Sequence, residues 1–309
     1  MRRSHVSFRS YAGFALVLGI AIALLGVALT AWRSGEAGSG SASPRRRGSR
    51  PAPLVLEARS DYSHIRLRRH GNALGLHFVR DNGVEALQTL VDLNRPHHLQ
   101  VPYTQVMFAT YLVKPAQERV LMLGLGGGAM IRFVSHYHPE LKVDAVEIDP
   151  VVIRIAEEHF GIRSEKNVRV VTDDAFRYVR ETGERYDAIY LDTFLKPSPD
   201  TDSTGKPLKV KTLDFYKDLQ ARLSPGGVVA FNLNRHDDLN EDLQTIREAF
   251  PHVYVFRVDF GNIIVLGATS PRRVDPATLR TRAAELDRRW RPNFSFRAML
   301  RLMARDPQP

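Results

Sequence analysis

The sequence predicts an α/β protein whose main domain is a largely parallel sheet ending in an antiparallel hairpin. From Arg119 onward, short apolar runs alternate with segments of helical pattern. Consecutive strands joined through helices pair in parallel, with the helices covering the sheet. The last two apolar runs, 252–258 and 262–269, are separated by three residues. A connection this short predicts an antiparallel pair at the sheet edge.

Composition and charge exclude several classes of protein. Hydrophobic residues make up 43% of the 309 residues, which excludes wholesale disorder. The absence of cysteine excludes disulfides, thiolate metal sites and cysteine nucleophiles. The net charge of +10 is concentrated at the ends, with +7 in residues 1–53 and +6 in residues 271–309, and residues 54–270 carry −3. We therefore expect no nucleic-acid partner, because a binding groove needs clustered positive charge.

Residues 1–33 are predicted to form a membrane anchor. Residues 10–32 contain no charge over 23 positions, about 34 Å as a helix, and Tyr11 and Trp32 flank the stretch. A cleaved signal peptide is the alternative, although its apolar region usually spans about 7–15 residues; a buried helix is disfavoured because the stretch lacks a polar face. The arginine bias favours a single-pass protein of a bacterial-type inner membrane, with its main domain in the cytoplasm.

We place the main domain at residues 115–270. Two further regions precede it in the sequence and one follows it. Residues 34–53, rich in Arg, Gly, Ser and Pro, predict a disordered linker. Residues 54–114 predict a small β-rich domain, in which "HIRLRRH" and "ALGLHFV" form a hairpin, followed by the helical "VPYTQVMFATYLV". Residues 271–309 predict an Arg-rich helical tail that is solvated, with contact to anionic lipid or acidic protein as the alternative.

The elements of the main domain follow from apolar runs and their caps. A helix is expected around 129–137, and Pro150 opens a second helix after an aspartate that can cap it. The expected parallel strands are "RVLMLG", "KVDAVEID", "VRVVTDD", "YDAIYLD" and "GVVAFNL".

The ends of these strands carry the candidate site, because ligands of open α/β sheets bind outside the carboxyl ends of the strands. The turn "GLGGGA" after the first strand lets the backbone approach a ligand at a helix N-terminus. Glu147 ends the second strand 21 residues beyond Gly126, a spacing at which a carboxylate binds ribose hydroxyls. A nucleoside site is therefore predicted, with a merely solvated carboxylate as the alternative for Glu147.

A dinucleotide site is the competing hypothesis, since Gly124, Gly126 and Ala129 satisfy GxGxxA. Three features argue against it. Asp173 and Asp174 follow the third strand, where a carboxylate can meet an adenine amine; "LSPGG" turns from a helix into the fifth strand; and the terminal hairpin replaces a second mononucleotide-binding half.

Taken together, these segments resemble the spermidine synthase (polyamine aminopropyltransferase) family, within the class I S-adenosylmethionine-dependent methyltransferase-like superfamily. The resemblance runs from about Ser60 to Ala268. It is carried in order by "SDYSHIRL", "VPYTQVM", "RVLMLGLGGG", "VEIDPVV", "DDAFRYV", "YDAIYLD" and "LDFYKDLQARLSPGGVVAFN". The fold that it implies is a Rossmann-like, seven-stranded methyltransferase-type sheet, preceded here by the small β-rich domain and the N-terminal transmembrane helix.

The resemblance implies a transferase that moves an aminopropyl group from decarboxylated S-adenosylmethionine to a putrescine-like amine. Asp192 would be the catalytic aspartate. The residues that would bind the nucleoside are Gly124, Gly126, Gly128, Glu147, Asp173, Asp174 and Ala175, with Glu147 on the ribose and Asp174 on the adenine amine. Independently of the resemblance, a carboxylate ending the fourth strand can orient an attacking amine and accept its proton. The alternative for Asp192 is an acid that caps a loop.

Three positions depart from the family pattern and leave other functions open. Gly127 and Leu195 stand where the family has acids, and Gln105 replaces a glutamate in the tyrosine-containing helix. Each change removes negative charge from a pocket for a polyamine. A methyltransferase using S-adenosylmethionine and a non-catalytic nucleoside-binding homologue are therefore the alternatives.

The remaining expectations concern substrate contacts, metals and assembly. Tyr103, Gln105 and Tyr190 are candidate substrate contacts, although the two tyrosines are equally compatible with the core. No metal is expected, because neither histidine pair, at 97–98 or at 136 and 138, has a third ligand at useful spacing. The resemblance also suggests a homodimer.

Overall fold

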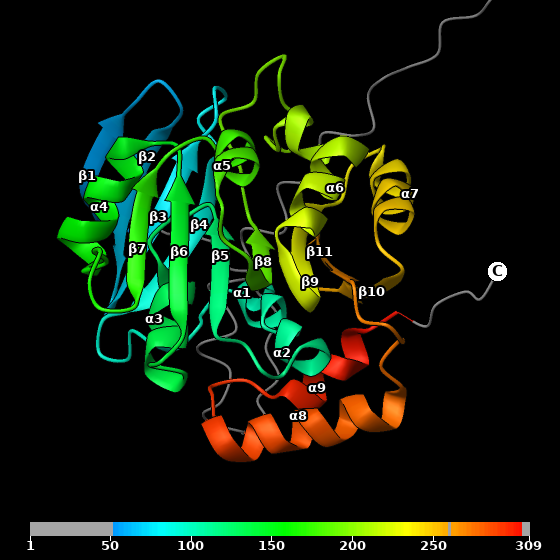
Figure 1. The fold of residues 1–309 in the computed structure, drawn as a ribbon. Helices are drawn as coiled ribbons and strands as arrows, with labels where there is room; N and C mark the ends of the chain where they lie inside the picture. Colours follow the sequence, from blue (N-terminus) through cyan, green and yellow to red (C-terminus); the bar gives the residue numbers. More distant parts are fainter. Residues whose placement is uncertain (1–51, 259–260, 305–309) are drawn as a thin grey trace, which may run out of the picture. The chain divides into compact units, whose positions relative to one another are not determined.

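The computed structural model describes residues 52–258 and 261–304, all of which belong to one compact unit that begins at Pro51. Two sheets organise this unit (Figure 1). The first is a four-stranded antiparallel meander in the order β1-β2-β3-β4. Its strands are β1 (Leu54–Arg59), β2 (His64–His70), β3 (Ala73–Val79) and β4 (Glu85–Asp92).

The predicted hairpin of the β-rich region is confirmed as β2 and β3, which pair from Ile65 with Phe78 to His70 with Ala73. The turn contains Gly71 at φ +61°, a conformation that glycine adopts without steric cost. Two short helices follow the meander, α1 (Pro102–Met107) and α2 (Thr110–Val113).

The second sheet has seven strands in the order β10-β11-β9-β8-β5-β6-β7. Five strands are mutually parallel through β9, and β11 runs antiparallel between β9 and β10. The predicted mixed sheet with its terminal antiparallel hairpin is therefore present. The strands are β5 (Arg119–Leu123), β6 (Lys142–Glu147), β7 (Val168–Thr172), β8 (Tyr186–Leu191), β9 (Leu223–Asn234), β10 (His252–Arg257) and β11 (Asn262–Ala268).

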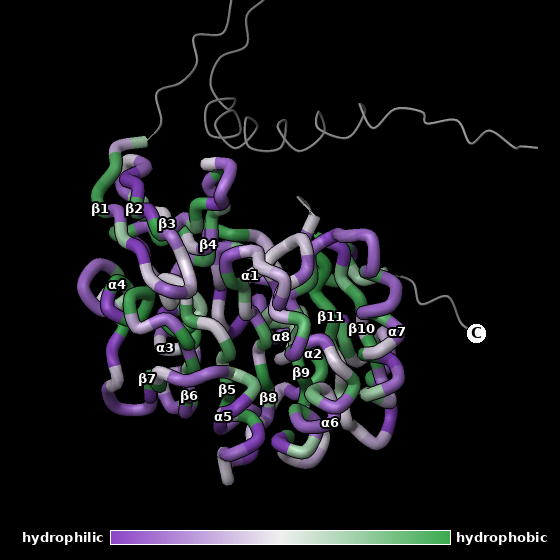
Figure 2. Tube along the Cα trace, turned by 90° about the horizontal axis from the view of Figure 1, so that it is seen from above, coloured by the Kyte–Doolittle hydropathy of each residue, from purple (hydrophilic) through white to green (hydrophobic). Residues whose placement is uncertain are grey.

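Helices cover both faces of this sheet. Successive side chains of a strand point to opposite faces, and both sets are buried. On one face, Val120 and Met122 pack with α3 (Ala129–Tyr137), α4 (Pro150–Phe160), the short helices and the meander. On the other face, Leu121 and Leu123 pack with α5 (Ala175–Glu181), α6 (Leu213–Ala221) and α7 (Leu239–Ala249). The strands are correspondingly hydrophobic, and β9, β10 and β11 stand out in green (Figure 2). Both faces are buried, which explains the continuous apolar runs in the sequence.

The C-terminal region forms α8 (Pro276–Trp290), α9 (Phe296–Met299) and a 3₁₀ turn, η3 (Leu300–Leu302). The α8 helix lies against α2 and α9 (Figure 1). One face of α8 is buried through Leu279, Ala283, Leu286 and Trp290. The sequence led us to expect a solvated helix; in the structure its apolar stripe belongs to the same core as α3.

The predicted membrane localisation is corrected by the structure. No helix among residues 52–258 and 261–304 combines the length and the apolar character needed to cross a bilayer. The two predicted segments at the N-terminus, the anchor at 1–33 and almost all of the linker at 34–53, lie outside the described residues.

Candidate active site

The carboxyl ends of four neighbouring parallel strands surround one pocket. The empty space inside it, including some open solvent, amounts to about 1120 Å³. Gly124 follows β5, Glu147 ends β6, Asp173 follows β7 and Asp192 follows β8; all four line this pocket. Parallel strands that share an edge bring together residues far apart in the sequence, and the predicted meeting of these side chains is present.

The glycine turn is shaped by its contacts with the neighbouring strand. Gly124 has φ +97°, and a Cβ there would overlap the backbone carbonyl of Asp192. Gly126 and Gly128 also have positive φ, at 52° and 70°, and all three glycines line the pocket. The backbone can therefore approach a ligand closely along this turn.

Gly127, where the resemblance would place an acid, does not line the pocket. Its N–H donates to Thr89 Oγ1 at 2.9 Å. A Cβ on Gly127 would lie 2.8 Å from Thr89 Cγ2 and 3.2 Å from the Phe160 ring. An acidic side chain at this position would require Thr89 and Phe160 to move, so the glycine and its neighbours fit each other.

Glu147 is held by the backbone at both carboxylate oxygens. Oε2 accepts the N–H of Leu125 at 3.0 Å, and Oε1 accepts the N–H of Asp149 at 3.0 Å. Burial raises the pKa of Glu147, and these two N–H donors partly offset the effect. The carboxylate keeps lone pairs for ligand hydroxyls, because each oxygen can accept more than one hydrogen bond.

Asp149 has a structural role, consistent with the cap that the sequence suggested. Its Oδ1 accepts the N–H of Val151 at the start of α4. Its Oδ2 accepts the hydroxyls of Ser60 and Ser63 at 2.6 and 2.7 Å. The link ties the β1–β2 turn to the end of β6, so Asp149 fastens the meander to the main sheet.

Asp174 lies at the N-terminus of α5 and is already engaged by a cation. Its Oδ1 caps the helix through the N–H of Phe176, and Lys209 Nζ lies 2.6 Å from its Oδ2. Burial raises the pKa of Asp174, but Lys209 and the helix N–H donors outweigh it, so the pKa is lowered. Asp173 is bound by Arg177 Nε at 2.7 Å, and Ala175 lines the pocket beside it.

Asp192 receives hydrogen bonds from two neutral side chains. Tyr103 donates its hydroxyl to Oδ2 at 3.1 Å, and Asn232 donates its side-chain amide to Oδ1 at 2.7 Å. Burial raises the pKa of Asp192; Asn232, the charge of Lys206 and Tyr103 partly offset it. A carboxylate with a raised pKa, held at a pocket wall, is suited to accept a proton.

The three candidate substrate contacts lie in different environments. Tyr103 lines the pocket and contacts Asp192. Tyr190 also lines the pocket, but its hydroxyl bonds to Thr110 at 2.8 Å. Gln105 is not among the lining residues: its side-chain amide donates to the Leu99 carbonyl at 2.8 Å. The structure therefore separates Gln105 from the other two.

Sequence reasoning missed several residues at the site. Thr89 binds the glycine turn from β4, Asn232 binds Asp192 from β9, and Lys209 binds Asp174 from η1 (Leu208–Lys211). Thr89 and Lys209 lie outside the motifs, and Asn232 ends the segment "LDFYKDLQARLSPGGVVAFN" without having been assigned a role; each acts across 35 or more residues of sequence. The only signal for Asn232 was its place near the carboxyl end of the predicted strand "GVVAFNL", the edge at which Asp192 also lies.

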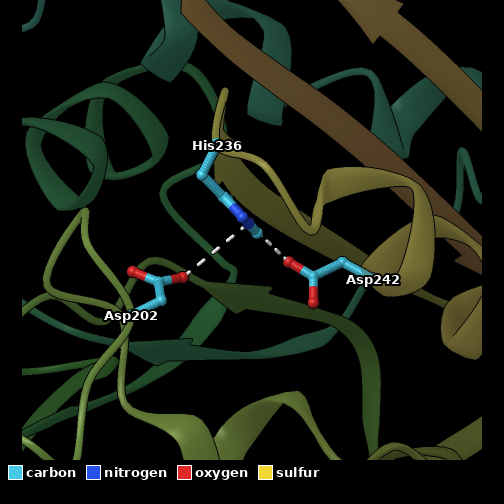
Figure 3. A group of neighbouring side chains, drawn as sticks. All are labelled: Asp202, His236 and Asp242. Carbon is cyan, nitrogen blue, oxygen red and sulfur yellow. Dashed lines mark hydrogen bonds and ion pairs between the residues drawn. The ribbon is translucent and has the colours of Figure 1, made fainter. Parts of the chain in front are cut away.

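A second group of polar side chains lies outside the set that lines the pocket. Asp202, His236 and Asp242 place one ligand atom each within 4.8 Å of one another, with the imidazole between the two carboxylates (Figure 3). Lys211 Nζ lies 3.0 Å from Asp202 Oδ2 and 2.9 Å from Asp242 Oδ2. The lysine ammonium supplies the positive charge that the two carboxylates need, so this group is a charge network.

Comparisons with known proteins agree with this geometry. The family model of the spermine/spermidine synthase domain matches residues 103–259. A polyamine aminopropyltransferase of Vibrio vulnificus is 32% identical over 221 residues, which cover 69% of this chain and 71% of that protein.

Two solved structures share the fold. A probable spermidine synthase from Corynebacterium glutamicum superposes with a TM-score of 0.62 at 23% identity, covering 76% of this chain and 87% of its own. Human methyltransferase-like protein 13 in complex with SAH superposes with a TM-score of 0.57 at 25% identity, covering 63% of this chain and 95% of its own.

Proposed function

Because the chain belongs to the spermine/spermidine synthase family, we propose that it is a transferase that moves an aminopropyl group from decarboxylated S-adenosylmethionine to an amine acceptor. One observation carries the proposal at the level of the site. Asp192 is held by Tyr103 and Asn232 at the wall of a pocket that Glu147 and the glycine turn also line.

The nucleoside would lie across the ends of β5, β6 and β7. In this placement Glu147 accepts the ribose hydroxyls, with its orientation fixed by two backbone N–H groups. Gly124, Gly126 and Gly128 pass close to the sulfonium nucleoside, while Asp173, Asp174 and Ala175 surround the adenine. Lys209 would have to share or release Asp174 when an adenine amine binds there.

Asp192 would orient the acceptor amine and take its proton. The lone pair of the amine nitrogen forms a new bond to the aminopropyl carbon that is attached to sulfur. The C–S bond breaks at the same time, and its electron pair goes to sulfur, leaving neutral methylthioadenosine. The proton lost from nitrogen passes to the Asp192 carboxylate. Its desolvated position strengthens it as a base, and Tyr103 and Asn232 hold it in place.

The alternative of a methyltransferase rests on one observation, the glycine at position 127. No carboxylate stands there to attract an aminopropyl ammonium, and Thr89 and Phe160 occupy the space that one would need. S-adenosylmethionine carries a carboxylate that the decarboxylated form lacks. The two nucleosides therefore distinguish the two functions.

The test is a transfer assay with each nucleoside and a panel of amines. We expect release of methylthioadenosine from the decarboxylated form, and calorimetry should show tighter binding of that form. Asp192→Asn should lower kcat by about 10²- to 10⁴-fold while the affinity for methylthioadenosine is retained. Tighter binding of S-adenosylmethionine with release of S-adenosylhomocysteine would favour the methyltransferase, and full turnover by Asp192→Asn would exclude this carboxylate as the base.

Two organisational expectations remain predictions. We propose domain boundaries at 54–114 and 115–270, supported by the separate hydrogen-bonded sheets. A homodimer remains a prediction that sedimentation of the purified protein would test.

A further inference from the structure

Lys206 is a buried cation close to the proposed catalytic carboxylate. It lies in the loop between β8 and η1 and is 1% exposed. Its Nζ donates to the backbone carbonyl of Asn232 at 2.9 Å and lies 4.7 Å from the centre of the Phe194 ring. Within the described residues Lys206 forms no ion pair. Burying an ammonium that has only a carbonyl and a ring as partners costs free energy, because no carboxylate pairs with the charge. A cation kept at such a cost beside a pocket is a candidate for a role there.

Asn232 connects this ammonium with Asp192. Its backbone carbonyl accepts from Lys206, and its side-chain amide donates to Asp192 Oδ1 at 2.7 Å. Asn262 donates to Asn232 Oδ1 at 3.0 Å, which fixes the orientation of that amide. The lysine and the carboxylate are therefore held on one residue of β9.

We propose that Lys206 is a positioning residue for Asp192: its buried positive charge keeps the neighbouring carboxyl group ionised and able to accept a proton from the acceptor amine. This role rests on the proposed function. Lys206 does not line the pocket, so it would act on the substrate only through Asp192.

The electrostatic balance supports this role. Burial raises the pKa of Asp192, which favours the neutral acid, and the charge of Lys206 acts in the opposite direction. Burial also lowers the pKa of Lys206 to about 8, although Asp192 partly offsets that shift. At neutral pH the lysine therefore remains protonated, and it loses its charge as the pH rises through about 8.

The other charged groups around Lys206 are paired among themselves. Asp202 and Asp242 also raise the pKa of Lys206, and Lys211 lowers it. Lys211 binds both of these carboxylates, and His236 Nε2 contacts Asp242 at 2.8 Å. Tyr103 faces Asp192 as a neutral donor.

The same network places Lys206. Asp202 Oδ1 accepts the backbone N–H of Lys206 at 3.0 Å and also the N–H of Thr204 at 2.9 Å. The turn is thereby fixed so that the lysine side chain enters the space between β9 and Phe194. Asp202, a member of the network in Figure 3, thus positions the backbone of Lys206.

The first test is a carboxyl titration of the wild-type protein. With ¹³C-labelled aspartate, the Asp192 signal is assigned by its loss in Asp192→Asn. We expect a main titration step for Asp192 and a second, smaller step near pH 8, where Lys206 loses its proton. A signal without the second step would overturn the proposal, and this measurement needs no variant at position 206.

The second test is the pH dependence of kcat at saturating amine. Lys206→Met should shift the acid limb upward by about one pH unit or more, so that activity on that limb falls about tenfold. Lys206→Arg should restore the wild-type acid limb and remove the carboxyl step near pH 8. Tyr216→Phe is the matched control, since Tyr216 is fully buried, its hydroxyl has no hydrogen-bond partner in the described part of the chain, and its loss should leave the acid limb in place.

The outcomes separate the two proposals. Aminopropyl transfer with an unshifted acid limb in Lys206→Met overturns the role of Lys206 alone. Absence of aminopropyl transfer by the wild-type protein to every amine overturns the proposed function and this role with it. If Lys206→Met does not fold, the wild-type titration decides.

Discussion

Two tyrosines that line the same pocket differ in the group that they serve. Tyr103 donates its hydroxyl to Asp192, whereas Tyr190 bonds to Thr110 and packs beside Phe108. Burial raises the pKa of both phenols, so both stay protonated at neutral pH. Tyr103 therefore acts on the carboxylate as a neutral donor, and Tyr190 supports the wall.

Tyr103→Phe should shift the acid limb of kcat to higher pH. The hydroxyl stabilises the ionised form of Asp192, and its loss raises a pKa that burial already raises. On acidification, Asp192 should therefore become protonated, and activity should fall, at a higher pH in the variant than in the wild type. A pH profile at saturating amine measures the shift. Tyr190→Phe should leave the limb where it is, and equal shifts in both variants would contradict the distinction.

Glu147→Gln should weaken methylthioadenosine binding at least tenfold, about 1.4 kcal/mol. An amide has one oxygen, so its NH₂ group would face the N–H of Leu125 or Asp149. Because burial raises the pKa of Glu147, the wild-type affinity should fall as the pH falls through that pKa, and the variant should lose this dependence. Calorimetry across pH measures both effects. The exposed Glu158→Gln is the control, and unchanged affinity in Glu147→Gln would contradict the proposed ribose contact.

At the scale of elements, the turn between β5 and α3 depends on close contact with the end of β8. Gly124 combines a positive φ with direct apposition to the Asp192 carbonyl. Gly71, in the β2–β3 turn, also has a positive φ, but a Cβ there meets no atom within 4 Å. A side chain at Gly71 would meet backbone strain alone, whereas one at Gly124 would meet both strain and steric overlap, so comparing the two positions separates the effects.

Gly124→Ala should destabilise the protein by about 2–5 kcal/mol, because strain and overlap add. Gly71→Ala should cost about 1–2 kcal/mol, from strain alone. Denaturant unfolding gives both free energies of unfolding. Equal losses in the two variants would show that apposition to β8 does not constrain the turn.

At the scale of the whole molecule, the C-terminal helix completes the core on one face of the large sheet. The Trp290 ring lies 4.7 Å from that of Tyr111, 5.7 Å from that of Phe133 and 5.8 Å from that of Phe296, measured between ring centres. Arg282 Nη1 also donates to the carbonyls of Leu112 and Val113, at the end of α2. Residues 276–299 are thus part of the unit that holds the pocket.

Trp290→Ala should lower the free energy of unfolding by about 3–5 kcal/mol, because a large cavity would remain among these rings. Arg288→Ala, on the exposed side of the same helix, should change it by less than about 0.5 kcal/mol. Thermal or denaturant unfolding measures the difference. A small effect of Trp290→Ala would contradict the role of α8 in the core.

The sequence by itself determined the order of strands and helices in the main domain, the terminal hairpin, and the meeting of Glu147, Asp173 and Asp192 at one sheet edge. These features depend on local periodicity and on the rule that parallel strands share their carboxyl ends. Only the tertiary structure decided that Thr89 and Asn232 reach the site with Lys206 behind it, that Gln105 does not, and that one face of α8 is buried. Such contacts join segments distant in sequence, and no local pattern records which buried surfaces or charges will meet across the fold.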